Sequence, residues 1–347
     1  MKRLELKMVR TDDMQGQYRL VLQCPNLEHL AWTPTLAITY QLLLFHLVTL
    51  SDEQTPCRIV SVDLTGTDVS DGELASLLNC LHKLQRLIVP WSSFGEKSCQ
   101  QVVWFLRDTL EELDVRSCSA LTTGMLQLVL MTCGKLKRLK AQSFCASILE
   151  KRTQDLHTLS NGVRIPLDDI NNDGYDGGMT LQLLASLNDS DQFQTSPAIL
   201  DSIQSWTWAC TGLEELELDV HGLGSSSDTI VSTFLTQLSA LISLQRLVLS
   251  WSSSESHAHE ASLDLTLRGG GDGGGLAKLK TLTRLRHYDV QNVNLLRMDV
   301  DDFRWIGTHW TSLRTVRTAW VDYEDVETKS KIQHLLRTEF PHVALVY

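Results

Sequence analysis

A single pattern, L-x-x-L-x-L, returns along most of this 347-residue chain and constrains its fold more than any other feature. Its most regular copies begin at Leu84, Leu110 and Leu136, at intervals of 26 residues. Two distant copies, 84–93 and 244–253, share seven of ten residues. We therefore predict a chain assembled from one repeated structural unit. The other copies begin at Leu27, Ile59, Leu213, Leu244, Leu285 and Leu313.

Between the copies, the spacing of apolar residues changes from about two to about 3.6, which indicates a strand followed by a helix. In 70–81, Ser70 and Glu73 form a capping-box signature before an amphipathic run. One such unit leaves an apolar edge that only neighbouring units can bury. We therefore predict an α/β array of stacked units with parallel strands inside and helices outside, and a last strand near Val343.

One unit carries a more specific signature. The segment 110–118, followed by 120–125 and 131–136, resembles the cysteine-containing class of leucine-rich repeat. This resemblance implies a single leucine-rich-repeat solenoid, or horseshoe, over residues 1–347, with parallel strands on its concave face and helices on its convex face.

Three cysteines stand where that class of repeat places a small buried residue at the end of the helix. Cys24, Cys133 and Cys210 each precede the first strand leucine of their unit by three residues. A free cysteine more often behaves as a small core hydrophobe than as a metal ligand or a redox sensor. We therefore expect these thiols in the core.

Repeats of this class are frequent in the substrate-binding part of F-box proteins, the exchangeable receptors of SCF-type ubiquitin ligases. The segments 206–216 and 302–313 are similar to fungal F-box/leucine-rich-repeat proteins. The resemblance implies a substrate receptor that binds target proteins on its concave face. We find no F-box in the chain, so the ligase adaptor is an expected partner if an F-box precedes Met1. The alternative is a free-standing scaffold or inhibitor of the ribonuclease-inhibitor type.

Composition narrows the partners and the compartment. Lys and Arg number 31 against 42 Asp and Glu, a net charge of −11, which argues against a nucleic-acid or anionic-membrane binder. The start has no signal peptide, and the apolar stretch 36–50 is short of the ~20 residues that a membrane span needs. Eight cysteines include no C-x-x-C pair. A cytoplasmic or nuclear location is expected.

Two irregular segments interrupt the array, and we interpret 168–198 and 252–277 as inserted loops. Asp169–Asp173 matches the first half of a calcium-binding EF-hand loop, although Thr180 replaces the bidentate glutamate. A metal-dependent protein that uses this loop, or His257 and His259, is therefore the less favoured alternative. No metal site, cofactor or catalytic motif is predicted, and we expect no enzyme.

Strand periodicity predicts which residues face a partner, because residues between the core leucines project from the concave face. The charge on that face is sectored, basic at 138–140 and acidic at 215–219. Tryptophans just past the strands are natural anchors if exposed; otherwise each covers the edge of its own repeat. Charged positions without a partner are expected to be solvated. The predicted protein-binding residues are Arg86, Asp114, Arg116, Arg138, Lys140, Glu215, Glu217, Asp219, Arg246, Asp289, Trp91 and Trp251.

Overall fold

The structure is a computed structural model, and it describes residues 2–6, 26–32, 57–145, 207–221, 228–251, 265–267, 275–291, 298–318 and 326–346. The chain divides into two compact units. The first unit is Met1–Gln142 with Asp176–Cys210, and the second unit is Ser143–Tyr175 with Thr211–Tyr347.

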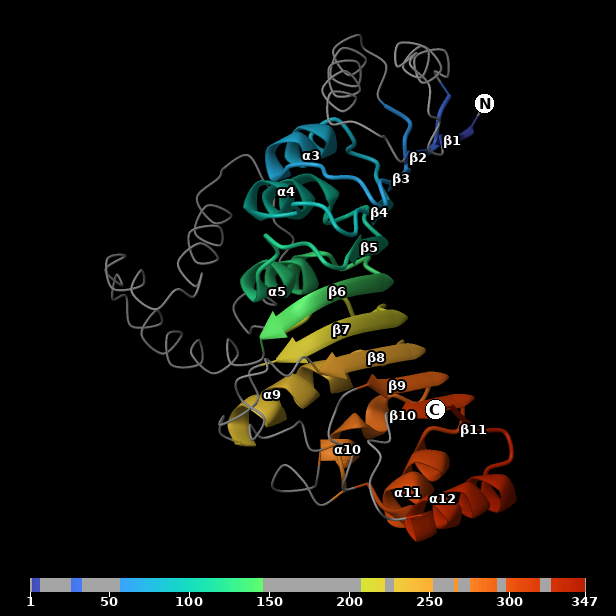
Figure 1. The fold of residues 1–347 in the computed structure, drawn as a ribbon. Helices are drawn as coiled ribbons and strands as arrows, with labels where there is room; N and C mark the ends of the chain where they lie inside the picture. The colour runs from blue at the N-terminus through green and yellow to red at the C-terminus, as the bar shows by residue number, and fades with distance from the viewer. Residues whose placement is uncertain are drawn as a thin grey trace, which may run out of the picture. The chain divides into compact units, whose positions relative to one another are not determined.

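From β3 onward, the first unit alternates strands with helices (Figure 1). Its described strands follow chain order, and each is parallel to the next. The π-helix η1 continues α4 directly. The elements are β1 (Arg3–Leu6), β2 (His29–Trp32), β3 (Ser61–Asp63), α3 (Asp71–Leu78), β4 (Arg86–Ile88), α4 (Glu96–Gln101), η1 (Val102–Leu106), β5 (Glu112–Val115), α5 (Thr123–Thr132) and β6 (Arg138–Cys145).

The second unit repeats the same alternation, again with parallel strands in chain order. Its elements are β7 (Glu215–His221), α9 (Asp228–Ser239), β8 (Arg246–Trp251), α10 (Gly275–Lys278), the 3-10 helix η3 (Leu279–Thr281), β9 (His287–Gln291), α11 (Val300–His309), β10 (Thr315–Thr318), α12 (Val326–Glu339) and β11 (Ala344–Val346). The predicted α/β class with parallel strands is therefore confirmed, and so is a last strand near Val343.

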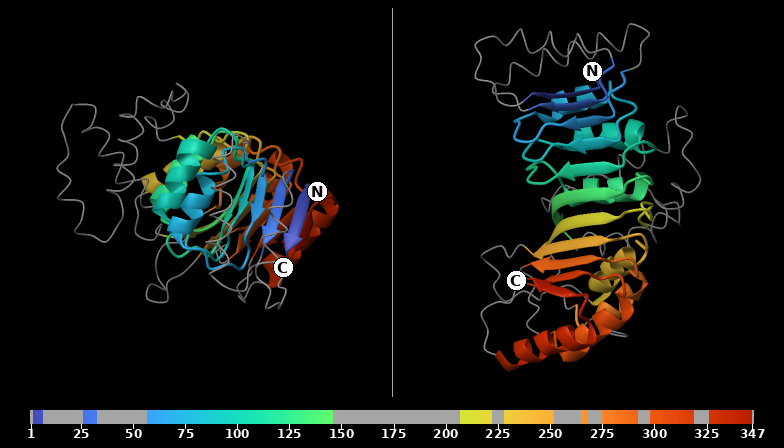
Figure 2. Two further views of the ribbon diagram at one scale, coloured as in Figure 1. Left: turned by 90° about the horizontal axis from the view of Figure 1, so that it is seen from above. Right: turned by 90° about the vertical axis from the view of Figure 1, so that its right-hand side faces the viewer.

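The leucine pattern sets both the position and the facing of the strands. In the first unit, Leu87, Leu113 and Leu139 stand opposite one another in the strand register, and all three are fully buried. The leucines that open each copy, three residues earlier, are buried as well. Helices α3, α4 and α5 lie on one side of this unit's strands (Figure 1 and Figure 2). The leucines therefore fill the layer between strands and helices.

The helix that follows β3 begins where the sequence predicts. The Ser70 side chain accepts a hydrogen bond from the Glu73 backbone N–H, and the Glu73 carboxylate accepts one from the Ser70 backbone N–H at 3.1 Å. This reciprocal pair satisfies two backbone donors that the first turn of a helix leaves open.

The cysteine positions at the helix ends also agree with the prediction where the structure describes them. Cys133 and Cys210 are fully buried, and burial raises the pKa of both thiols to about 12. They fill the core as small apolar side chains. Cys24 lies outside the described residues.

None of the helices in the described part of the chain has the length and apolar composition needed to cross a membrane. The apolar stretch 36–50 and the predicted loop at 168–198 lie outside the described residues, as does most of the predicted loop at 252–277.

Candidate protein-binding surface

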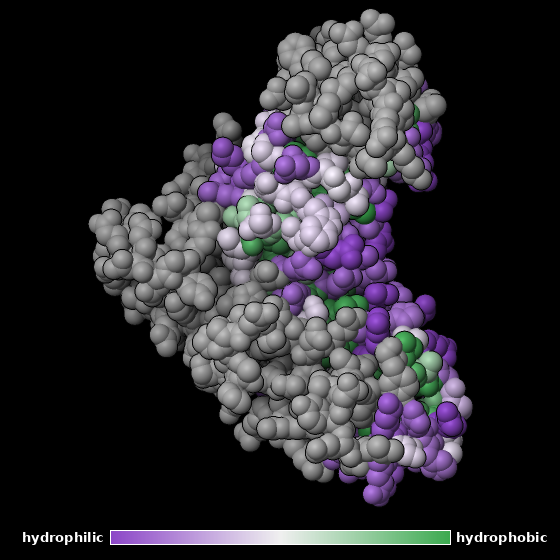
Figure 3. Space-filling view, in the orientation of Figure 1, coloured by the Kyte–Doolittle hydropathy of each residue, from purple (hydrophilic) through white to green (hydrophobic). Residues whose placement is uncertain are grey.

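The outward side chains of three neighbouring strands form a charged surface in the first unit. Register places Arg86, Glu112 and Arg138 in one row across β4, β5 and β6. On the side shown in Figure 3, hydrophilic residues cover these strands. We call this surface the β4–β6 face, and its charged residues are Arg86, Glu112, Asp114, Arg116, Arg138 and Lys140.

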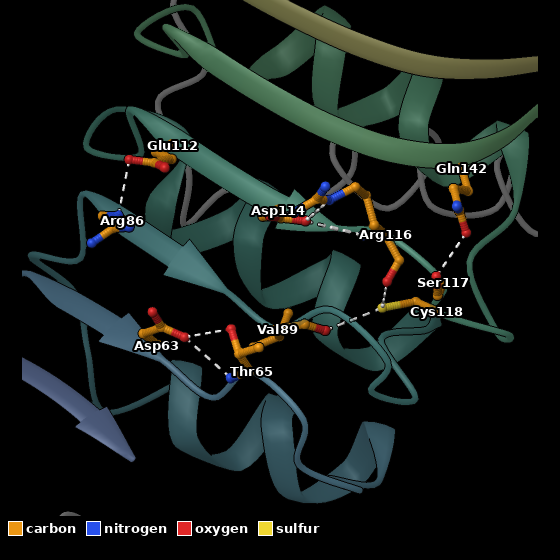
Figure 4. Close-up of polar contacts among 10 residues, drawn as sticks. All are labelled: Asp63, Thr65, Arg86, Val89, Glu112, Asp114, Arg116, Ser117, Cys118 and Gln142. Carbon is orange, nitrogen blue, oxygen red and sulfur yellow. Dashed lines mark hydrogen bonds and ion pairs between the residues drawn. The ribbon is translucent and has the colours of Figure 1, made fainter. Parts of the chain in front are cut away.

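Glu112 lies at the centre of the row and binds a guanidinium on each side. Its Oε2 atom lies 3.0 Å from Nε of Arg86 and 2.7 Å from Nη2 of Arg138 (the Arg86 contact is drawn in Figure 4). Parallel register brings the three side chains together, because corresponding residues of adjacent strands are neighbours. One carboxylate therefore fixes two arginines from different repeats.

A second carboxylate holds the third arginine in a fork. Asp114 accepts from Arg116 twice, at 3.0 Å from Nε to Oδ1 and at 2.8 Å from Nη2 to Oδ2 (Figure 4). Two parallel N–H donors fix both the position and the plane of the guanidinium, which a single contact does not. Arg116 is therefore the most rigidly oriented cation of the β4–β6 face.

The charges of this face are layered by depth. The side chains of Glu112 and Asp114 are only 13% and 7% exposed. Their partners Arg86, Arg116 and Arg138 are 44%, 39% and 36% exposed. The carboxylates therefore lie beneath the guanidinium groups, and a molecule that approaches this face meets cations first.

Lys140 adds a fourth cation to this layer. It stands opposite Asp114 in the register of β5 and β6. Within the part of the chain that the structure describes, Lys140 makes no ion pair. Among the described side chains, no carboxylate occupies its ammonium.

Trp91 lies next to this charged surface and is the most exposed large apolar side chain among the described residues, at 69%. Its backbone N–H donates to the Arg116 carbonyl at 2.9 Å, so it follows β4 beside the carboxyl end of β5. Its φ angle is 67°, in the left-handed region that disfavours a bulky residue by about 1–2 kcal/mol. Neighbouring contacts hold this conformation, because strained residues persist only where the surroundings determine them.

The turns after β4 and β5 are tied to each other and to β6. The Cys118 thiol lies 3.3 Å from the Val89 carbonyl and 3.4 Å from the Ser92 hydroxyl. Ser117, with φ of 58°, donates from its hydroxyl to the Gln142 side-chain oxygen at 2.8 Å (Figure 4). Burial raises the pKa of the Cys118 thiol, which stays protonated as a donor at neutral pH. These contacts hold the edge on which Trp91 stands.

The second unit carries more acid than base on its outward side chains. Arg246 is exposed and stands opposite Glu215 in register. Nη1 of Arg317 lies 3.8 Å from Oδ2 of Asp289. The predicted residues Glu215, Glu217, Asp219, Arg246 and Asp289 all lie on outward positions of this unit.

Not every outward position is solvated as expected. Asp114 is buried beneath Arg116, and Ile88 on β4 is buried although it faces outward. The prediction of solvated charges is therefore wrong for Asp114, because its fork with a neighbouring arginine covers it. Trp91 meets the condition of exposure on which the anchor prediction depends, and the anchor itself stays a prediction. Trp251 is the last residue of β8, but the structure does not describe its side chain.

Sequence reasoning left Glu112 out of the predicted binding residues, although it organises the β4–β6 face. The signal was present: Arg86, Glu112 and Arg138 are separated by 26 residues each, the interval of the repeat. Charges that alternate in sign at the repeat interval become neighbours in a parallel register.

The two predicted alternatives for a metal site fall on residues that the structure does not describe. Asp169–Asp173, His257 and His259 are not described. Among the described residues, no group of three or more His, Cys, Asp or Glu side chains is arranged to hold a metal ion.

Comparison with known proteins does not indicate a ligand for this surface. The chain matches no protein-family model, and no curated protein is significantly similar to it. What the β4–β6 face binds must therefore be inferred from its own residues.

Proposed function

We propose that this chain is a non-enzymatic protein-recognition module, a leucine-rich-repeat solenoid curved as a horseshoe that binds target proteins on the outward face of its strands. The observation that carries the proposal is the exposed layer of arginines on a parallel sheet. Parallel sheets are normally covered on both faces. In the first unit, helices lie on one face, and Arg86, Arg116 and Arg138 are presented on the other.

The arginines of this face suit recognition better than solubility. Long side chains on a surface are normally mobile, and ordering them on binding has an entropic cost. Glu112 and Asp114 already hold three guanidinium groups in place. A partner would therefore meet donors that are oriented before it arrives.

We further propose that the module is the substrate receptor of an SCF-type ubiquitin ligase in the cytoplasm or nucleus. The support for this role is the resemblance of 110–118, 206–216 and 302–313 to F-box/leucine-rich-repeat proteins. It is an inference by analogy, since one fold serves many functions. In this proposal an F-box upstream of Met1 would bind the ligase adaptor.

Site-specific photo-crosslinking in cells would test the proposal. A benzoylphenylalanine at position 86, on the β4–β6 face, should form adducts with a protein target. The same group at position 97, an exposed lysine on α4, is the control and should not. Adducts that do not distinguish the two positions would refute recognition by the strand face.

The same experiment with the full-length gene product distinguishes a substrate receptor from a free-standing scaffold or inhibitor. Recovery of the ligase adaptor together with the position-86 adduct supports the substrate receptor. Position-86 adducts without adaptor, from a gene that encodes no F-box, support the free-standing scaffold or inhibitor instead.

A further inference from the structure

We propose that the β4–β6 face binds a short, extended acidic segment of a protein partner, whose carboxylates pair with Arg86, Arg138 and Lys140 while an apolar side chain packs on Trp91. This inference rests on the proposed recognition function and names the chemistry of the partner. It is argued from four properties of the face: its charge, its unused donors, its apolar anchor and its dimensions.

Charge gives the first step. The β4–β6 face has four cations against two carboxylates, in a chain whose net charge is −11. The two carboxylates, Glu112 and Asp114, are the least exposed members of the set. A local cationic layer selects a partner whose contacting residues are acidic.

Unused hydrogen-bond donors give the second step. The contact of Arg86 with Glu112 is made through Nε, and the terminal amino groups of the guanidinium carry four further N–H donors. Lys140 has no ion pair among the described residues. A guanidinium donates to a carboxylate through two parallel N–H groups, and an ammonium binds one as a point charge. Both groups suit Asp or Glu side chains of a partner.

The apolar anchor gives the third step. In the described part of the first unit, Trp91 alone is a large apolar side chain with most of its surface exposed. Its positive φ would suit glycine, so the fold itself does not favour tryptophan there. Strain of this kind concentrates at functional positions. Exposed tryptophan beside arginine is also the composition that dominates binding energy at interfaces.

The dimensions of the face give the fourth step. Arg86 and Trp91 are five positions apart, which is at most roughly 16 Å, because β4 ends at Ile88 and Trp91 lies in the turn that follows. Strands β4 and β6 lie about 10 Å apart. An extended chain covers this length with about five residues. The partner segment is therefore expected to place an apolar residue about five positions from a pair of acidic residues.

The same features disfavour a polyphosphate. Nucleic acid binding depends on many cations that follow the phosphate backbone. The cationic layer ends at β3, where Ser61 stands opposite Arg86. The other outward residue of β3 is Asp63, which accepts two hydrogen bonds from Thr65 (Figure 4). A short acidic segment fits the four cations, and a long polyanion that continued past β4 would meet Asp63.

The test is a selection of random twelve-residue peptides, displayed on phage, on the full chain. Selected sequences should be enriched in Asp and Glu and contain an apolar residue. Binding of a selected peptide, measured by fluorescence anisotropy, should weaken at least about tenfold for Trp91→Gly and for Arg86→Gln with Lys140→Gln. The double variant leaves Arg138 on Glu112, so no buried carboxylate loses its last partner.

Lys83→Gln with Lys135→Gln is the matched control, because these exposed lysines stand in the turns before β4 and β6 and change the charge equally. It should alter binding less than about twofold if local contacts, and not net charge, decide affinity.

The outcomes separate the two proposals. Selected peptides that lack acidic residues but lose binding in the face variants overturn the acidic partner and leave recognition by this face intact. Peptides that bind all variants equally overturn both proposals for this face. Absence of enrichment overturns the linear segment. Binding of a 20-nucleotide oligo-dT that is lost in the same variants reassigns the cations to phosphate and overturns the inference too.

Discussion

Asp71 at the start of α3 caps the helix that begins after Gly95, in the next repeat along the chain. Its Oδ1 atom accepts the Gly95 N–H at 2.9 Å and the Ser98 N–H at 3.0 Å, and its Oδ2 atom accepts the Lys97 N–H at 2.9 Å. Gly95 has no side chain with which to cap α4 itself. One repeat therefore satisfies the open backbone donors of the next, and stacking and helix initiation become coupled.

Asp71→Ala is expected to lower the free energy of unfolding by about 1–2 kcal/mol, since it removes a charged cap from three backbone donors. Urea unfolding followed by circular dichroism measures the change. Asp68→Ala is the control: Asp68 is exposed and makes no hydrogen bond or ion pair among the described residues, so it should change stability by less than about 0.5 kcal/mol. Equal effects of the two substitutions would contradict the inter-repeat cap.

Trp91→Gly is expected to give a more stable protein than Trp91→Ala, by about 1 kcal/mol. Both substitutions remove the exposed ring, but only glycine adopts a φ of 67° without steric cost. Thermal unfolding of the two variants, side by side, measures the difference. Ser117→Gly should likewise be more stable than Ser117→Ala, because both lose the hydroxyl that donates to Gln142 and only glycine adopts a φ of 58° without steric cost. If alanine and glycine are equally stable at position 91, the backbone is not strained there.

Glu112→Gln is expected to release the two arginines that the carboxylate holds while costing less than about 1 kcal/mol of stability, because the guanidinium groups are partly exposed. The readout is the Nε–H resonance of Arg86, which should exchange faster with solvent in the variant. If the Glu112 carboxylate does not hold Arg86, that resonance should be unchanged in the variant.

Glu111→Gln is the matched control for this experiment. Glu111 pairs with Lys137 at 2.8 Å, and that pair involves none of the residues of the β4–β6 face. The same chemical change should leave the Arg86 resonance as it is. A shift of equal size in both variants would mean that the charge of the face, and not the Glu112 contact, orders Arg86.

Trp208→Phe is expected to cost about 2–3 kcal/mol. The indole Nε1–H donates to the Gln127 side-chain oxygen at 3.0 Å, and both residues are buried. The Gln127 side-chain nitrogen has no partner among the described residues. Loss of the indole would therefore leave the whole amide unsatisfied in the core. Gln127→Leu in the Trp208→Phe background should recover most of the stability, and a double variant no better than Trp208→Phe would contradict this explanation.

The regular parts of the fold could be predicted because the leucines encode them. Each described copy of L-x-x-L-x-L coincides with a strand, since a strand needs one apolar face and the repeat interval sets its neighbour. The contact from Trp208 to Gln127 could not be predicted. It joins residues 81 positions apart, and no periodic signal relates them.

The sequence could predict which side chains of the candidate site share a face of the sheet, but not how deeply each one is buried. Alternation indicated that Asp114 and Arg116 share a face, yet their fork and the burial of Asp114 depend on side-chain rotamers and on neighbouring strands. The left-handed backbone of Trp91 depends on how its turn joins the next one. Such properties arise from packing between repeats, which a single repeat's sequence does not contain.

Gly307→Ala tests the packing of the second unit, where α11 meets the residue that follows α12. A methyl group at position 307 would lie 2.6 Å from ring carbons of Phe340, closer than side chains tolerate. We expect a loss of about 1–3 kcal/mol, the usual cost of overpacking, measured by urea unfolding. Phe340→Leu in the Gly307→Ala background gives the methyl group room and should restore part of the loss, so the two substitutions should be non-additive. Strict additivity of the two effects would mean that Gly307 and Phe340 do not pack against each other.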